Sequence, residues 1–147
     1  MIDKKDELIL KELEKNSRET ATSLSRTLNI PRVTIHDRIQ KMINNKIIKK
    51  FTIIPDYKKI NQGCKVFIFV SFRSDYDISQ KELAKKISKI NGIYEVNIIS
   101  GEYDLLLKVR GSTLDEIGKL VVEKLRQIKG VGKTLTFACF DTIKEET

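Results

Sequence analysis

Apolar residues recur at helical spacing in three stretches of the first third of the chain, and this spacing predicts helices over residues 3–15, 20–28 and 32–44. The side chains expected to face inward are Ile9, Leu10, Leu13, Leu24, Leu28, Ile35, Ile39, Met42 and Ile43. Asn29 tolerates the left-handed conformation that turns a chain after a helix, and Pro31 favours a new helix start. Two helices joined by a turn of about three residues predict a helix-turn-helix.

The residues after the third helix combine β-branched side chains with several lysines. The stretch KIIKKFTIIP, residues 46–55, predicts two short strands that form a wing, and Pro55 closes this module. Residues 55–64 mix Pro, Asp, Asn and Gly, which predicts a linker. The chain is therefore expected to divide into a winged helix-turn-helix domain at 1–54, the linker, and a second domain at 65–147.

The second domain repeats the layout strand, helix, strand. The predicted strands are 65–73, 94–100, 103–110 and 132–140, and the predicted helices are 79–91 and 113–128. Ser79 with Glu82, and Thr113 with Glu116, form capping-box patterns at the helix starts. The order βαββαβ predicts a ferredoxin-like sandwich, so the fold class of the whole chain is α+β.

The strands predict a second subunit. Both helices of a ferredoxin-like sandwich cover one face of the sheet, and the other face should be polar in a monomer. The first strand is instead apolar on both faces, with Val66, Ile68, Val70 and Phe72 on one and Phe67 and Phe69 on the other. The last strand likewise mixes Leu135, Phe137 and Cys139 with Ala138 and Phe140. We therefore expect a homodimer, which would also carry two helix-turn-helix modules to two half-sites.

Charge points to a polyanionic partner. The net charge is +8, and residues 26–50 carry seven Lys or Arg residues against one acid, Asp37. A solvated lysine-rich surface would have the same composition, but the major groove of DNA admits one helix whose first residues reach base edges. Base reading is predicted for Arg32, Val33, Thr34 and His36, and phosphate contacts for Arg38, Lys41 and Lys49. Any one of these side chains could instead be an ordinary exposed residue.

Other features narrow the class of protein. No apolar run approaches the roughly 20 residues of a membrane-spanning helix, and the charged N-terminus MIDKKDELIL is unlike a signal peptide, so a cytoplasmic protein without membrane contact is expected. Cys64, Cys139 and the single His36 cannot form a zinc site, and the cysteines are read as reduced, mostly buried thiols. No metal and no cofactor are expected.

Four segments resemble the Lrp/AsnC (leucine-responsive, or feast/famine) family of prokaryotic transcription regulators. They are IDKKDELILKEL (2–13), RVTIHDRIQKM (32–42), SGEYDLLLKVRG (100–111) and KGVGKTLTF (129–137), and together they span nearly the whole chain. The resemblance implies a non-enzymatic regulator that binds operator DNA, acts on the transcription machinery, and assembles from homodimers into tetramers or octamers. An archaeal member is expected.

The resemblance also implies that amino acids or similar small molecules bind between dimers and modulate DNA affinity. The residues implied are Ser100, Gly101, Tyr103, Asp104, Thr134 and Thr136. A carboxylate such as Asp104 can accept bonds from an α-amino group, and threonine hydroxyls can bind a carboxylate. The alternative is a purely structural hairpin in which Gly101 makes the turn, Tyr103 packs, and Asp104 caps a backbone amide.

Two other functions fit less well. The RNA-recognition motif shares the βαββαβ order but needs aromatic residues on its third strand, where this chain has Leu105, Leu107 and Val109. A small enzyme would need a nucleophile–base pair, paired carboxylates or a P-loop, and the sequence suggests none of them.

Overall fold

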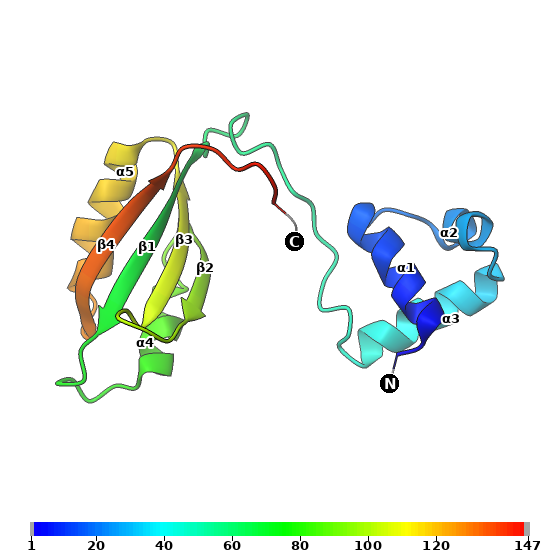
Figure 1. Ribbon diagram of the computed structural model, residues 1–147, viewed down its shortest axis with the longest axis horizontal. Coiled ribbons are helices and arrows are strands. Elements are labelled where there is room, and N and C mark those ends of the chain that lie inside the picture. Colours follow the sequence, from blue (N-terminus) through cyan, green and yellow to red (C-terminus); the bar gives the residue numbers. More distant parts are fainter. Residues whose placement is uncertain (1, 146–147) are drawn as a thin grey trace. The chain divides into compact units, whose positions relative to one another are not determined.

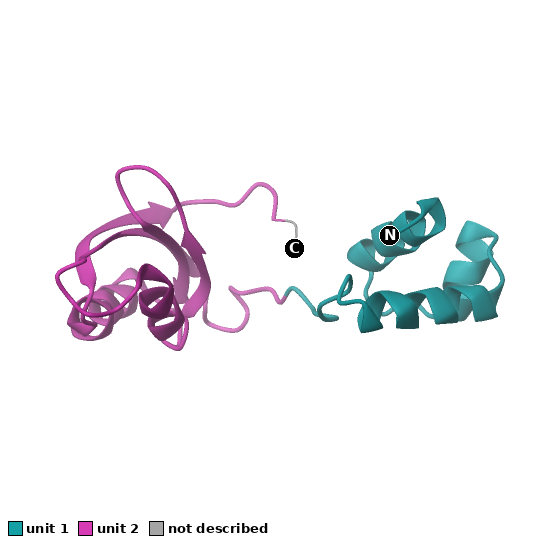
Figure 2. Ribbon diagram, turned by 90° about the horizontal axis from the view of Figure 1, so that it is seen from below, with its two compact units in different colours: residues 1–54, 146–147 teal, residues 55–145 magenta. Residues whose placement is uncertain are grey.

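The computed structural model describes residues 2–145, so the outermost residues of the predicted domains, 1 and 146–147, lie outside the described residues. The chain forms two compact units, one reaching Ile54 and the other running from Pro55 to Glu145 (Figure 2). Residues 55–63 belong to the second unit, where the Tyr57 ring meets the Tyr94 ring edge-on at 5.7 Å between centroids.

The first unit is a three-helix bundle of α1 (Lys4–Lys15), α2 (Ala21–Leu28) and α3 (Arg32–Asn44) (Figure 1). Caps define the helix ends: Asp3 and Asp6 form a reciprocal capping box on α1, and the Thr20 hydroxyl accepts from the Ser23 N–H on α2. Asn29 ends α2 in the left-handed region at φ 52°. The buried core is Ile9, Leu13, Leu24, Ile30, Ile35 and Met42. The predicted helix-turn-helix is therefore confirmed.

The predicted wing is not formed. Within the described chain no strand lies between α3 and residue 64, and residues 49–54 run as unpaired chain. The N–H groups of Ile47 and Ile48 both donate to the Met42 carbonyl oxygen. These two residues were predicted to lie in the first strand of the wing, but they instead close the end of α3. Phe51 and Ile53 are exposed, and no described strand pairs with the segment that carries them.

The second unit is the predicted ferredoxin-like sandwich. Its elements are β1 (Cys64–Phe72), α4 (Gln80–Ile87), β2 (Ile93–Ile98), β3 (Leu105–Gly111), α5 (Leu114–Lys119) and β4 (Val131–Cys139). The strand order is β2-β3-β1-β4 with every pair antiparallel. Both helices cover the same face of the sheet (Figure 2). Their buried residues meet alternate residues of β1 and β3, so one core lies between the two layers.

The helix predicted over 113–128 is continuous in path but changes type. After α5 the chain makes a π-helical turn, Leu120–Lys124, and a 3₁₀ turn, Leu125–Gln127. The apolar residues Ile117, Val121 and Leu125 are four apart, which drifts around an ideal α-helix of about 3.6 residues per turn. The wider π turn offsets this drift and keeps all three side chains buried.

Candidate functional site

The first turn of α3 presents a continuous exposed surface. Ile35 and Met42 point into the bundle core, which directs the opposite side of the helix outward. Arg32 and His36 are exposed, Val33 is 71% exposed, and Thr34 is half-buried. Val33 is therefore not part of the buried core of the first unit. The four residues predicted to read bases therefore share one end of α3.

Arg38 differs from the other predicted phosphate contacts. Its Nη1 lies 2.7 Å from Asp3 Oδ2 and 2.8 Å from Asp6 Oδ1, and its side chain is 25% exposed. Hydrogen bonding to Asp3 and Asp6 raises the pKa of Arg38, and the bond from Arg38 lowers the pKa of Asp3. Arg38 thus joins α1 to α3, a contact that the sequence reasoning missed.

The remaining cations predicted to meet phosphates are exposed. Lys41 lies on the last turn of α3, and Lys49 follows in the unpaired segment, next to the exposed Lys50. A flexible, exposed lysine is suited to phosphate oxygens, which lie along both edges of a groove. The first unit therefore offers an exposed apolar and basic helix end with further cations beyond the end of the same helix.

The turn between β2 and β3 carries four of the six residues implied for effector binding. Gly101 stands at φ 129°, with nothing within 4 Å of a Cβ placed there, so glycine is required by the backbone and not by crowding. The Asp104 carboxylate accepts from the Phe72 N–H at 2.6 Å and from Gln80 Nε2 at 3.2 Å. The Tyr103 ring packs on Phe69 at 5.5 Å. These contacts agree with the structural-hairpin alternative.

The two threonines lie on β4, where Thr134 is paired with Val70 and Thr136 with Ile68. The Thr134 hydroxyl accepts from Arg126 Nε at 2.9 Å, and Thr136 is exposed. The backbone N–H of Asp104 donates to the Val70 carbonyl from the other side of β1. Asp104 and Thr134 therefore stand at one level of the sheet, two strand spacings or roughly 10 Å apart.

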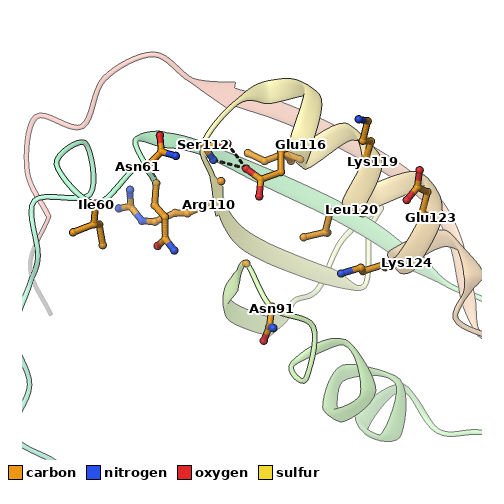
Figure 3. Close-up of a pocket in the computed structure, with 14 residues that line it drawn as sticks. Ile60, Asn61, Asn91, Arg110, Ser112, Glu116, Lys119, Leu120, Glu123 and Lys124 are labelled. Atoms are coloured by element: carbon orange, nitrogen blue, oxygen red, sulfur yellow. Dashed lines mark hydrogen bonds between the residues drawn. The ribbon is translucent and has the colours of Figure 1, made fainter.

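A cavity of about 480 Å³ opens at the end of β3 that is opposite to the Ser100–Asp104 turn (Figure 3). Its lining includes Asn61, Asn91, Arg110, Ser112 and Glu116, and none of the six residues implied for the effector. The Glu116 carboxylate accepts from the N–H and the hydroxyl of Ser112, which lowers its pKa. The Thr113 hydroxyl accepts from the Glu116 N–H as the capping-box pattern predicted, but the Glu116 carboxylate binds Ser112, one residue before its predicted partner Thr113. Because the lining comes from distant segments, no local sequence pattern could predict the cavity.

The sheet face away from the helices carries an exposed apolar cluster. Phe69 and Phe137 meet edge-on with ring centroids 5.6 Å apart, and the register places Phe67 opposite Phe137 and Phe69 opposite Leu135. Phe137 is 49% exposed and Leu135 41%. We name Phe67, Phe69, Leu135 and Phe137 the aromatic face. This cluster confirms the prediction that β1 and β4 carry apolar side chains on the sheet face away from the helices.

The described residues hold no group of three or more His, Cys, Asp or Glu side chains placed to bind a metal ion. Cys64 packs on the helix-side core, whereas the register places Cys139 opposite Lys65 on the other face. No described helix has the length and apolar character needed to cross a membrane.

Each of the two units matches the model of a known protein domain. Residues 2–43 match the model of the AsnC-type helix-turn-helix domain, and residues 65–147 match that of the Lrp/AsnC ligand binding domain. An HTH-type transcriptional regulator of Pyrococcus furiosus is 51% identical, over 99% of this chain and 97% of its own. The regulator LysM of Saccharolobus solfataricus is 36% identical, over 88% and 87%. A regulator of Neisseria meningitidis, solved as a complex with L-Met, superposes at TM-score 0.92 with 24% identity, over 100% and 95%.

Proposed function

The chain belongs to the Lrp/AsnC family of helix-turn-helix transcription regulators, and we propose that α3 reads operator DNA in the major groove while the second unit dimerises and binds an amino acid. The observation that carries the DNA proposal is the open end of α3, where Arg32, Val33 and His36 are exposed together. Such a helix end can contact base edges, and Arg32 can pair bidentately with a guanine. We expect such a regulator to act in the cytoplasm on the transcription machinery.

The test is selection of duplexes from random DNA by the full-length protein. Enrichment of a two-fold symmetric sequence with half-sites about one helical turn apart, or a multiple of that, would support a dimer reading DNA through α3. Loss of enrichment on Arg32→Ala would tie the reading to this helix. Enrichment that is unchanged by Arg32→Ala and by Val33→Ala would overturn the assignment of α3.

The aromatic face supports homodimerisation. Large apolar side chains exposed together on a sheet face mark an association surface, and an isologous dimer would cover this face on both subunits. Assembly into tetramers or octamers would follow through the same second unit. Sedimentation or light scattering of the full-length protein tests this step independently of DNA.

An amino-acid effector is supported by the match to a ligand-binding domain and by the L-Met complex of the structural neighbour. We place it at the Ser100–Asp104 turn with Thr134 and Thr136, where a small molecule could bridge the two strands that flank β1. Calorimetry with each of the twenty amino acids is the experiment. Absence of heat for all of them would leave Asp104 as a structural residue only.

A further inference from the structure

Three cations converge at one end of the sheet face that the helices leave open. The register places Lys65 opposite Arg110, and Lys108 two residues before Arg110 on the same side of β3. The side chains of Lys65 and Arg110 are 8% and 6% exposed, and that of Lys108 is 18% exposed. Burying cations this deeply is unfavourable unless anions pair with them. We name these three residues the cation cluster.

The anion that pairs with the cation cluster is Glu145, which lies beyond β4. Its carboxylate is 2.7 Å from Lys108 Nζ, 3.1 Å from Arg110 Nη2 and 3.9 Å from Lys65 Nζ. The only other carboxylate that the described contacts bring to the cluster is Glu95, 3.0 Å from Lys108 Nζ and half-exposed. Three cations thus face two carboxylates, and only one of these comes from the segment after β4.

Arg110 has unused binding capacity. Glu145 takes its hydrogen bonds from Nη2 through both oxygens, whereas Arg110 Nε is buried without a hydrogen-bond partner among the described residues. A guanidinium binds oxyanions best through two parallel N–H groups, such as Nε with one Nη. An oxyanion that accepts from both Nε and one Nη of Arg110 would therefore fit this guanidinium better than Glu145, which accepts from Nη2 alone.

The segment that carries Glu145 is held by polar contacts. Phe140 and Ile143 are fully or almost fully exposed, so no apolar packing of these residues anchors residues 140–145. Lys65 Nζ also donates to the Thr142 hydroxyl, which adds to the electrostatic attachment of the segment. A competing anion would displace the segment without exposing a core.

We propose that Lys65, Lys108 and Arg110 form an oxyanion-binding site, that Glu145 occupies it in the unliganded subunit, and that a small phosphate or carboxylate compound competes with Glu145. The site is separate from the Ser100–Asp104 turn, which lies at the opposite end of β3. It stays open to small anions beside a dimer that covers the aromatic face, because Arg110 also lines the cavity of about 480 Å³. Its occupancy acts on the segment that leads to the first unit, because the Arg110 guanidinium stacks on Tyr57 at 3.6 Å from the ring centroid. Figure 3 shows Arg110 reaching toward Ile60 and Asn61 of that segment.

The experiment titrates inorganic phosphate, at ionic strength held constant with chloride, into full-length wild type, Glu145→Gln, and Glu145→Gln with Lys108→Gln. Thermal unfolding and trypsin cleavage after the exposed Lys58 and Lys59 are the two readouts. A tethered carboxylate acts at an effective concentration on the order of millimolar. Glu145→Gln should therefore respond at ~10-fold lower phosphate than wild type, with slower cleavage. The double variant should lose this response, and Asp77→Asn, which removes an exposed carboxylate in the loop between β1 and α4, should titrate like wild type.

Two results would overturn the proposal. Equal phosphate responses in all variants would place the binding elsewhere, for instance on the exposed cations of the first unit. No response in Glu145→Gln would make Glu145 a structural tie only.

Discussion

Arg38 Nη1 lies 2.7 Å from Asp3 Oδ2 and 2.8 Å from Asp6 Oδ1, so one guanidinium joins the start of α1 to the middle of α3. Arg38→Ala should lower the unfolding temperature, because α1 loses its ionic contact with α3. Asp6→Asn should act in the same direction, and the double variant should lose less than the sum, because both changes break one network. Circular dichroism during heating measures this, and an unchanged midpoint for Arg38→Ala would contradict it.

Arg32 is the matched comparison on the same helix. Its side chain is exposed, so Arg32→Ala should leave thermal unfolding unchanged while weakening specific binding by ~1–3 kcal/mol if Arg32 reads a base. Fluorescence anisotropy with the selected operator gives the affinity. Equal losses on specific and random duplexes would reassign Arg32 to the phosphates.

Lys41 and Lys49 should report on phosphate contacts. Log affinity should fall with log salt by about 0.9 for each phosphate neutralised. Replacing both lysines with alanine should reduce that slope by ~2 for each subunit on the DNA, or ~4 for a dimer, while weakening all sequences alike. A slope that is flat in wild type would count against DNA binding by this unit.

The aromatic face predicts the oligomer. Phe137→Glu places a charge among Phe67, Phe69 and Leu135, so it should shift the protein toward monomers and lower DNA affinity through loss of the second half-site. Leu114→Glu, a similarly exposed apolar residue at the start of α5, should leave the assembly unchanged. Analytical ultracentrifugation distinguishes the two variants, and a Phe137→Glu protein of wild-type mass would sink the proposed interface.

Asp104 and Thr136 separate structure from ligand binding at the proposed effector site. Asp104→Ala leaves the Phe72 N–H without its acceptor and should cost roughly 1–3 kcal/mol of unfolding free energy, with or without an effector. Thr136→Val changes an exposed hydroxyl and should preserve stability while reducing effector heat. Denaturant unfolding with calorimetry measures both, and unchanged effector heat in Thr136→Val would remove Thr136 from the site.

Acid should release the segment that carries Glu145. The hydrogen bond from Lys108 holds the pKa of Glu145 below its ordinary value of 4.5, and the charges of Lys108, Lys65 and Arg110 act in the same direction. A carboxyl group with a depressed pKa stabilises the fold above its unfolded-state pKa, and this contribution disappears as the pH falls through the folded-state pKa. The amide chemical shifts of residues 139–145 should therefore change as the pH falls below 4.5. Glu145→Gln should show the shifts of the released segment at every pH.

The helices, the strands, the ferredoxin-like order and the outward side of α3 were predictable because each depends on periodicity within a short stretch. The spacing of Ile35 and Met42 is enough to orient α3. Successive side chains of a strand point to opposite faces, so the continuous apolar run in β1 is enough to predict that both of its faces are apolar. The capping box of Ser79 and Glu82 was equally local. These features need no knowledge of what lies across the fold.

Tertiary structure decided the partners of charged side chains and the fate of the wing. Asp3 and Arg38 are 35 residues apart, as are Arg110 and Glu145, and no local pattern relates such pairs. A strand forms only where another backbone pairs with it, and residues 49–54 have no such neighbour among residues 2–145. Sequence determines which side of an element faces inward, but only folding in three dimensions brings a particular carboxylate to a particular cation.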